Sequence, residues 1–415
     1  MREKVKYPKD WRLLSVASLV DDKKDLFDDG DWIEAEYLTD SGIRLIQTGN
    51  VGEGIFVDKE KKKYISEQSF TKLKCKELNV GDILICRLAD PAGRACILPD
   101  IGEEKMITSV DVSIYRPKLD YVDRTFIVAS MSTANWFNEI RERCGGSTRT
   151  RIARSELGKL KIPLPPLPEQ KAIAQVLSTA DAAIHTTEKL IAQKELRKKW
   201  LMQQLLTGKK RLKGFGEEWK EKKLSDLFDR VTRKNTEGNT TVVTISAQRG
   251  FVRQTDFFNK NIASEITDNY FLVERGEFCY NKSYSNGYPW GATKRLNDFD
   301  KAVVTTLYIC FGVKDQKKTN PDFFEQYFNA NLLDKGLTKI AHEGGRAHGL
   351  LNVTPSDFFS LKVTVPSYEE QTAIAQVLQV ADKEISLLKA KAEKLREQKK
   401  GLMQVLLTGK KRLIF

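Results

Sequence analysis

The stretch LMQQLLTGKKRL at residues 201–212 returns almost unchanged as LMQVLLTGKKRL at residues 402–413. The likeness extends backwards at the same offset of 201 residues, so that EQKAIAQVLSTAD (169–181) aligns with EQTAIAQVLQVAD (370–382). Between 169 and 212, 24 of 44 aligned positions are identical. The chain is therefore an internal duplication, and the repeated segment decides its fold.

Each copy of the repeat follows a longer region whose letters differ. These regions open alike, with WRLLSVASLV (11–20) and WKEKKLSDLF (219–228). The expected layout has four parts: a first globular domain at 1–160, a helical arm at 161–213, a second globular domain at 214–362 and a second helical arm at 363–415.

Length and composition are typical of a soluble protein with two or three domains. The chain has 415 residues, of which 40% are hydrophobic and 30% charged. It lacks an apolar run of about 18 residues, which a membrane span requires, and MREKVKYPKDW at its start is unlike a secretory signal. We expect a cytoplasmic protein without a membrane partner. The six cysteines form no CxxC pair, which predicts reduced, mostly buried thiols rather than zinc ligands.

The formal charge of +13 favours a polyanionic partner. Most of this charge lies in the repeats. Residues 169–213 contain ten Lys/Arg against four Asp/Glu, and residues 370–412 contain ten against five. The rest of the chain carries only about +2, so nucleic-acid contacts there depend on local placement.

Both repeats have the end signals of a helix. Ser367 and Glu370 have the spacing of a capping box, and Pro168 suits a first helical turn. Gly208 and Gly409 suit the left-handed position after a helix. The Lys-Lys-Arg that follows each glycine is expected near the negative helix end, whatever the function.

The apolar spacing of the arms is that of a coiled-coil seam. In the second arm it consists of Ile374, Val377, Ala381, Ile385, Leu388, Ala392, Leu395, Leu402 and Leu406. In the first arm it consists of Ile173, Val176, Ala180, Ile184, Ile191, Leu201 and Leu205, interrupted by Thr187, Lys194 and Lys198. We expect an antiparallel pair of helices, each about 57 Å long, related by a pseudo-twofold axis with one globular domain at each end. The alternative is a pair of ordinary oligomerisation helices. Gly401 replaces Trp200, which allows a close approach or a bend.

The two variable regions are predicted to be mixed α/β domains. The β-rich stretches are GIRLIQTGNV (42–51), GDILICRL (81–88), TVVTISAQRGFV (241–252) and AVVTTLYICFGV (302–313). The helical stretches are 125–143 and 321–340, each followed by a glycine-rich turn and a short strand.

Motifs for catalysis are missing from the sequence. It contains no phosphate-binding loop, no dinucleotide fingerprint and no motif for a flipped adenine. PDIGEEK (99–105) resembles a nuclease carboxylate cluster, but its spacing is too short for two strands, so we expect a polar turn. The three histidines form no metal or triad pattern. We therefore predict neither an active site nor a cofactor nor a metal.

Side chains suited to DNA contact gather on strand-end turns, on glycine-rich turns and in YNKSYSNGYPWGATKR (280–295). Arginine pairs bidentately with guanine, and Gln and Asn pair with adenine. The candidates are Gln47, Asn50, Arg87, Arg94, Arg149, Arg151, Gln248, Arg249, Lys282, Tyr284, Asn286, Arg295, Arg346 and His348. For each of them the alternative is a satisfied surface polar group, and for 280–295 it is a β-hairpin with packed aromatic residues.

PLPPLPEQKAIAQVL (163–177) and EEQTAIAQVL (369–378), with the two LTGKKRL ends, resemble the conserved regions of a known family. The family is that of the specificity (S, or HsdS) subunits of type I restriction-modification systems. GIRLIQTGNVGEG, GDILICR and GGSTRTRI in the first variable region are similar to recurrent pieces of the same family. The resemblance covers the whole layout.

The resemblance implies a non-catalytic DNA-binding subunit with two target recognition domains. Each domain is expected to contact one half of an asymmetric, bipartite site in double-stranded DNA, while the helices set the gap between the halves. The implied partners are two adenine-N6 methyltransferase (M) subunits, which carry S-adenosylmethionine, and two restriction/motor (R) subunits. In this interpretation the repeated arms offer two equivalent docking surfaces. The basic residues Lys209, Lys210 and Arg211 then contact DNA, a partner or only the helix end.

Two other hypotheses stay open at this point. The chain is a stand-alone DNA-binding regulator that dimerises through its arms, or an enzyme with an unrecognised active site. Neighbouring genes for a methyltransferase and a helicase-nuclease, and tests of the chain alone for turnover, distinguish the three.

Overall fold

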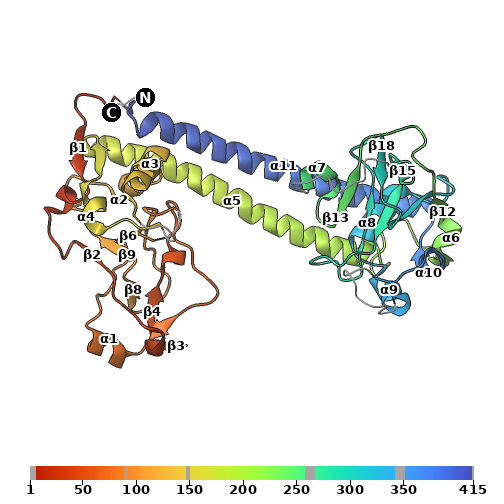
Figure 1. Ribbon diagram of the computed structural model, residues 1–415, viewed down its shortest axis with the longest axis horizontal. Helices are drawn as coiled ribbons and strands as arrows, with labels where there is room; N and C mark the ends of the chain where they lie inside the picture. The colour runs from red at the N-terminus through yellow and green to blue at the C-terminus, as the bar shows by residue number, and fades with distance from the viewer. Residues whose placement is uncertain (1–5, 89–90, 146–149, 258–266, 342–350, 414–415) are drawn as a thin grey trace. The chain divides into compact units, whose positions relative to one another are not determined.

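A computed structural model describes residues 6–88, 91–145, 150–257, 267–341 and 351–413. The chain divides into two compact units. The first unit consists of Met1–Glu188 and Ala390–Phe415, and the second of Lys189–Lys389. Both units contain strands, short helices and a stretch of two long helices (Figure 1). The predicted α/β class with two long helices is confirmed.

Two four-stranded sheets form the body of the first unit. The antiparallel sheet has the order β2-β9-β6-β7, with β2 (Phe27–Asp29), β6 (Ile83–Cys86), β7 (Ala95–Ile97) and β9 (Val112–Tyr115). The second sheet has the order β3-β5-β4-β8, with β3 (Leu38–Thr39), β4 (Ile43–Ile46), β5 (Tyr64–Ile65) and β8 (Met106–Thr108). Within these two sheets, β4 and β8 pair in parallel and the other described strand pairs are antiparallel. All residues of β4, β6, β8 and β9 are buried, including the polar or charged residues Arg44, Thr108 and Ser113.

Short helices and one separate strand pair complete the first unit. The helices are α1 (Glu67–Leu73), α2 (Arg124–Ser130), α3 (Ala134–Arg143) and α4 (Arg154–Lys159), with 3-10 turns at Ser18–Val20, Ala35–Tyr37 and Thr48–Asn50. Strand β1 (Arg12–Ser15) pairs antiparallel with β10 (Lys161–Leu164), so the start of the unit lies beside the entry to the long helix. The main core contains Tyr115, Phe126 and Leu157.

The second unit repeats this plan with different residues. Its four-stranded antiparallel sheet has the order β12-β19-β16-β17, with β12 (Phe228–Val231), β16 (Phe278–Asn281), β17 (Ala292–Arg295) and β19 (Ile309–Val313). Two further antiparallel pairs are β13 (Val243–Ser246) with β14 (Gly250–Arg253) and β15 (Phe271–Glu274) with β18 (Lys301–Val304). The helices are α6 (Leu224–Leu227), α7 (Gln254–Phe257), α8 (Pro321–Asn329), α9 (Asp334–Ile340) and α10 (Pro355–Ser360).

The second strand pair of the repeat is also present. Strand β11 (Lys220–Lys223) pairs with β20 (Lys362–Val365) as β1 pairs with β10. The sequence similarity that begins at Trp11 and Trp219 therefore corresponds to a repeated strand pair. A dense aromatic core with Phe228, Phe311 and Phe324 fills this unit.

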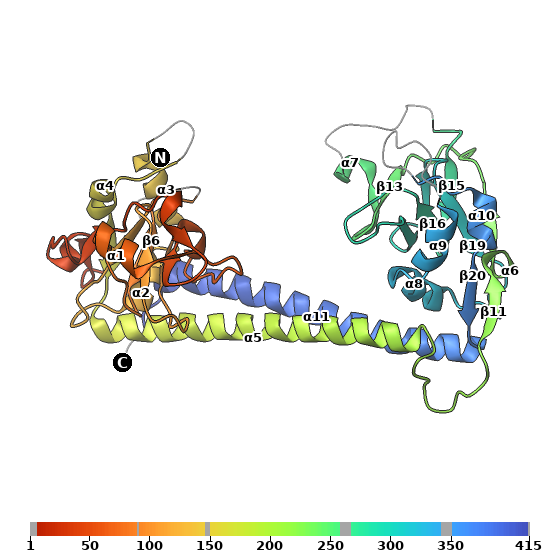
Figure 2. The ribbon, with the colours of Figure 1, turned by 90° about the horizontal axis from the view of Figure 1, so that it is seen from below.

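The long helices α5 (Leu167–Leu205) and α11 (Tyr368–Leu406) have 39 residues each and run side by side (Figures 1 and 2). In the first unit Asp181 bonds to Lys399, and in the second unit Lys198 bonds to Asp382. Rising numbers in one helix face falling numbers in the other, so the pair is antiparallel, as predicted.

The ends of the long helices are built into the globular cores. Ile173, Leu177 and Leu406 belong to the core of the first unit. Leu205, Ile374 and Leu378 belong to the core of the second. The apolar seam is therefore shared between helix pairing and domain packing, and the four-part division at 160, 213 and 362 stays a prediction.

Several local expectations are corrected. The helical stretches 125–143 and 321–340 are each split into two helices. Thr133 caps the second helix of the first pair by accepting from the amide of Trp136 at 3.3 Å, and Asn331, with φ of 57°, interrupts the other stretch. Gly401 is exposed, and an added Cβ would meet no atom within 4 Å, so no close approach requires this glycine, while the expected bend stays a prediction.

Across the described ranges, no helix combines the length and the apolar character that crossing a bilayer requires.

Candidate nucleic-acid interface

Glu370, in the first turn of α11, is the centre of a buried ion-pair cluster in the second unit. Only 1% of its surface is exposed. Nε and Nη2 of Arg211 donate to its two carboxylate oxygens at 2.6 Å each. The indole of Trp219 donates at 3.2 Å, and its ring lies 5.7 Å from the guanidinium carbon of Arg211. We call Glu370, Arg211 and Trp219 the second start cluster.

The first unit contains the same arrangement around Glu169, the first start cluster. Arg412 donates to the two oxygens of Glu169 at 2.6 and 2.7 Å, and Trp11 donates at 3.3 Å. Arg412 also bonds to Asp10 at 2.8 and 3.0 Å, and this bond lowers the pKa of the Asp10 carboxyl. Gly409 has a φ of 68°, which glycine adopts without strain, so the chain can turn here. An added Cβ would also lie 2.5 Å from Pro8, so a larger residue does not fit at this position.

The glutamines after the two glutamates hold the adjacent domain helices. Gln170 accepts from the amide of Asp123, the residue that caps α2, at 2.9 Å. Gln371 accepts from the amide of Asn320, the residue that caps α8, also at 2.9 Å. Each side-chain amide also donates to two backbone carbonyl groups. The Glu-Gln pair thus fixes the start of each long helix to its surroundings.

These clusters correct two expectations about the repeat. The arginine of each Lys-Lys-Arg binds the start of the other long helix, instead of serving only as a cation near its own helix end. The carboxylate of Glu370 is used by Arg211 and Trp219, so the expected capping box is half formed: only Ser367 Oγ accepts, from the amide of Glu370 at 3.4 Å. The sequence contained a signal for these clusters, since each half of the chain has the same Trp, Glu and Arg, with Glu169 and Arg211 repeated as Glu370 and Arg412.

In the first unit, several DNA-binding candidates have partners inside the domain. The Asn50 side chain is buried, accepts from the amide of Gln47 at 2.9 Å and donates to the carbonyl of Val57 at 2.8 Å. Arg94 donates to the carbonyl oxygens of Val51, Thr48 and Pro91 at 2.6, 2.9 and 2.9 Å. These side chains determine the shape of the turn after β4; a direct DNA contact by them stays a prediction.

Arg87 is 3% exposed and joins three segments. Its guanidinium donates to the carbonyls of Val110 and Ile152 at 2.6 and 3.3 Å and pairs with Asp29 at 3.0 Å. Arg151 lies nearby and is exposed, with Asp111 at 3.0 Å. Of the first unit's charged candidates, Arg151 is the one the structure leaves at the surface among the described residues.

In the second unit, the strands of 280–295 form the hairpin that was the alternative for this stretch. Arg295 pairs with Asp322 at 2.5 Å and with Glu325 at 3.4 Å. The ammonium of Lys294 bonds to Asn329 at 2.7 Å, and burial lowers its pKa to about 8. The ammonium of Lys282 donates to the carbonyl of Val353 at 3.5 Å.

Four candidates of the second unit lie on two adjoining loops. Gln248 and Arg249 occupy the turn between β13 and β14, while Tyr284 and Asn286 lie between β16 and β17. The side chain of Gln248 donates to the carbonyl of Asn286 at 3.1 Å, which joins the two loops. All four residues are exposed, Tyr284 by 67%. All four residues are candidates from the sequence, and the structure brings them together.

Arg149, Arg346 and His348 lie outside the described residues. The described residues hold no group of three or more His, Cys, Asp or Glu side chains arranged to hold a metal ion.

Five of the six cysteines are buried thiols, and Cys144 is half-buried. The buried ones are Cys75, Cys86, Cys96, Cys279 and Cys310. PDIGEEK contains a polar turn in which Asp100 accepts from the amide of Gly102 at 2.9 Å, as predicted.

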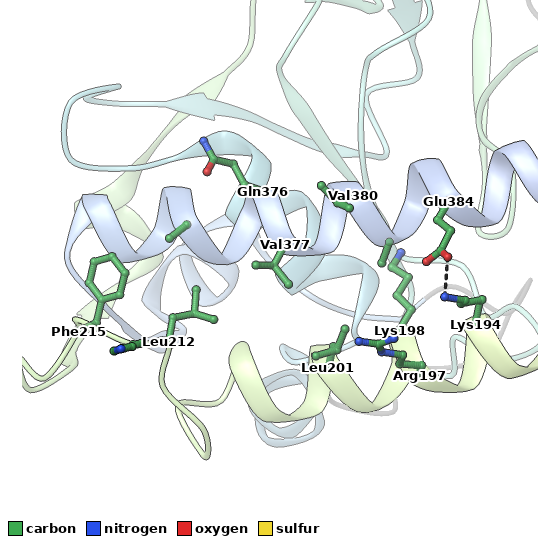
Figure 3. A pocket seen from close by; sticks show the side chains of 13 residues that line it. Lys194, Arg197, Lys198, Leu201, Leu212, Phe215, Gln376, Val377, Val380 and Glu384 are labelled. Atoms are coloured by element: carbon green, nitrogen blue, oxygen red, sulfur yellow. Dashed lines mark ion pairs between the residues drawn. The ribbon is translucent and has the colours of Figure 1, made fainter.

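A groove of about 530 Å³ lies beside the long helices of the second unit (Figure 3). The side chains of Leu201, Val377 and Val380 line it, together with Leu212 and Phe215 from the loop after α5. Basic residues surround this apolar floor, and Lys194 pairs with Glu384 at 2.5 Å.

Two α/β units with the same four-stranded sheet order and the same outer strand pair, each built around the end of a long helix and with exposed polar loops, define a modular binding protein. The sequence matches the family described as "Type I restriction modification DNA specificity domain" over residues 21–195 and again over residues 216–397. The chain belongs to this family, and its role is to supply DNA sequence specificity to a type I restriction-modification system.

Similar proteins support the assignment along nearly the whole chain. The putative type I restriction enzyme MjaX specificity subunit of Methanocaldococcus jannaschii is 26% identical over 404 residues, covering 91% of this chain and 86% of that protein. The type I S subunit of M. genitalium shares the fold with a TM-score of 0.55, at 16% identity and 98% coverage of both chains. The HsdS subunit of Thermoanaerobacter tengcongensis matches with a TM-score of 0.51, at 14% identity, covering 98% of this chain and 99% of that one.

Proposed function

We propose that each unit contacts one half of a bipartite, asymmetric site in double-stranded DNA, and that the chain itself catalyses no reaction. The observation that carries the proposal is the double family match, because each match contains the α/β part of one unit and most of the long helix that follows it. We also propose target recognition domains at 1–160 and 214–362 with helical segments at 161–213 and 363–415. The proposed DNA partner supports a cytoplasmic location.

We propose the long helices as the docking site for two adenine-N6 methyltransferase subunits, through which the restriction/motor subunits join. Five large apolar side chains on the helices are exposed, and we propose that they contribute to this docking site. They are Leu190, Leu196, Trp200, Val380 and Leu387. The apolar groove of Figure 3 adjoins this surface.

The expectation of two equivalent docking surfaces needs refinement. All five exposed apolar residues belong to the helix stretches of the second unit. At the offset of 201 residues the first unit has polar residues or glycine instead, namely Lys391, Glu397, Gly401, Thr179 and Thr186. In the proposal, one methyltransferase copy therefore binds an apolar surface and the other a polar one.

For the second half-site we propose direct contact by Gln248, Arg249, Tyr284 and Asn286. Their exposure and their common position on two joined loops support this proposal. Gln and Arg provide bidentate hydrogen bonds to base edges, and an exposed Tyr adds an apolar contact. Asn50, Arg87, Arg94 and Arg295 then act by holding the loops in place.

Alanine variants of Gln248 and Arg249 test this loop assignment. We expect each to weaken binding of the specific DNA by about tenfold, because a bidentate base contact contributes roughly 1–3 kcal/mol. The measurement is DNA affinity of the assembled methyltransferase complex against salt concentration. A loss that is equal for all sequences, with a salt slope lower by about one, would indicate a phosphate contact instead.

Lys362→Ala is the matched control, because Lys362 is an exposed cation on β20, outside both loops. We expect it to leave the affinity unchanged. Unchanged affinity in both loop variants would contradict the assignment.

The function as a whole is tested by reconstitution. The chain is co-purified with the methyltransferase subunit of its own gene cluster, and the modified DNA is sequenced. We expect N6-methyladenine at one bipartite motif and no turnover by the chain alone with DNA, S-adenosylmethionine and Mg²⁺. Methylation or cleavage by the isolated chain would show that it is an enzyme.

A further inference from the structure

Of the five ion pairs that the described residues form between α5 and α11, four fall into two classes when the repeat offset is applied. In the first class both helices contribute the same residue types. Asp181 of α5 pairs with Lys399 of α11 in the first unit, and Asp382 of α11 pairs with Lys198 of α5 in the second. Asp181 and Asp382 are 201 positions apart, and so are Lys198 and Lys399, so the repeat offset converts each pair into the other. In this class each helix therefore contributes one Asp and one Lys at equivalent positions.

The second class reverses its charges. In the first unit Glu188 of α5 pairs with Arg396 of α11, and in the second unit Glu195 of α5 pairs with Lys389 of α11, at 2.6 Å. These two positions are also related by the offset of 201 residues. Here α5 supplies both carboxylates and α11 supplies both cations.

A fifth pair has no charged counterpart at all. Lys194 of α5 pairs with Glu384 of α11 in the second unit at 2.5 Å. At the offset positions in the first unit stand Leu395 and Ala183. This contact also exists only when α5 meets α11.

The alternative partner for each helix is the same helix of a second copy of the chain. The seam and the start clusters do not prevent such homotypic pairs, because Arg211 could meet Glu169 as well as Glu370. Asp181 and Lys198 would also remain complementary. Glu188, however, would face Glu195 twice in an α5 pair, and Lys389 would face Arg396 twice in an α11 pair.

We infer that these charges select the α5–α11 pairing and reject pairing of either helix with its own kind in a second copy. Opposite charges beside a helical seam determine which partner is accepted, and like charges at the same sites exclude the wrong one. The interaction surface of α5 thus fits α11 and no second α5. The inference concerns the assembly of the chain and goes beyond its proposed role on DNA.

The individual ion pairs are exposed, so each contributes little to the free energy of helix pairing. The selection of the partner depends on the sum of several pairs. Converting two α5–α11 pairs into one α5 pair and one α11 pair replaces four attractions by four repulsions. It also removes two Lys194–Glu384 contacts. We expect homotypic pairs to be depleted at least about tenfold relative to random pairing at low salt, and much less near 1 M salt.

Two variants of the full chain separate pairing strength from pairing choice. Glu188→Arg with Arg396→Glu keeps both ion pairs of the native chain but reverses one, so that each helix carries one acid and one base. Homotypic pairs then become complementary. Adding Glu195→Lys and Lys389→Glu reverses both pairs, which restores the selection with opposite sign. The fourfold variant is the matched control, since it changes more residues yet should behave like the native chain.

The experiment uses the folded full chain with a protease site between Lys213 and Gly214. Cleavage leaves α5 on one fragment and α11 on the other. Heavy and light isotope-labelled preparations are mixed and exchanged, with mild urea where needed, until the labels are scrambled. Native mass spectrometry then counts the mixed and homotypic pairs. Thermal denaturation of the uncleaved variants shows that they are folded.

We expect mixed pairs almost alone for the native chain and for the fourfold variant, and abundant homotypic pairs for the twofold variant. Restored homotypic pairing of the native fragments near 1 M salt is also expected. Equal amounts of homotypic pairs in all three proteins, or none in the twofold variant, would overturn the inference.

Discussion

At the scale of residues, the two start clusters explain why the chain repeats Thr-Gly-Lys-Lys-Arg. Glu370 and Glu169 are buried carboxylates, and a buried charge is tolerated only when it is paired and hydrogen-bonded. Arg211 and Arg412 supply a bidentate pairing in each unit. The lysines before them are exposed, so they are free of this structural role.

Replacing Arg211 by Met tests the second start cluster. The carboxylate of Glu370 then loses two hydrogen bonds inside a buried site. We expect the Tm of the second unit to fall by about 5 °C or more, because an uncompensated buried charge is strongly destabilising. Arg211→Met combined with Glu370→Gln should recover part of the loss. The measurement is thermal unfolding by calorimetry.

Lys209→Met removes a neighbouring exposed cation and is the control, with no expected change in Tm. If Arg211→Met and Lys209→Met behaved alike, Arg211 would have only the general role of a cation near a helix end.

Residue types were easier to predict from the sequence than residue partners. The sequence indicated Gln248, Arg249, Tyr284 and Asn286 as exposed candidates, and the structure places them on two joined loops. It equally indicated Arg87, whose guanidinium is buried among carbonyl groups far away in the chain. An arginine on a strand-end turn has the same local sequence in either case, and only tertiary packing decides which way it points.

At the scale of elements, the helices were predictable because their signals are local. The seam, Pro168 and the glycines after each helix define α5 and α11 almost completely. Thr187, which interrupts the seam, is accommodated by bonding to the carbonyl of Ala183 at 2.8 Å. The split of 125–143 into α2 and α3 was missed, since a capping threonine inside an amphipathic stretch is a weak signal.

Insertion of seven residues into both long helices tests their proposed role as a spacer. Insertions after Ile191 and after Ala392 stand at the same repeat position, because the two residues are 201 positions apart. Seven residues preserve the seam and add about 10 Å. We expect the same two half-sites with a gap about three base pairs longer, measured by sequencing methylated DNA.

An insertion after Ile191 alone is the control. It shifts one helix against the other, and we expect it to lower stability because ion pairs such as Glu195–Lys389 lose register. New half-site sequences after the double insertion would contradict the spacer role.

At the scale of the whole molecule, the duplication is the feature that the sequence states most plainly. The repeat extends to topology: β2-β9-β6-β7 and β12-β19-β16-β17 have the same strand order, although their residues differ. Core residues differ because each unit is packed with its own side chains, aromatic in the second and largely aliphatic in the first. The core residues that the helix ends contact were not readable from spacing alone.

The repeated topology means that each unit can change its recognition loops while the helix pair stays the same. Leu205, Ile374 and Leu378 form part of the second unit's core. A domain taken from another family member must therefore pack against these residues. The best donor is a protein whose long helices are most similar in sequence to α5 and α11.

The most direct test of two separate recognition units is an exchange of residues 214–360 for the corresponding region of another family member. The exchanged chain is assembled with its methyltransferase subunits, and the methylated DNA is sequenced. We predict that one half-site changes to that of the donor while the other half-site stays as in the parent. A change in both half-sites, or in neither, would contradict the account.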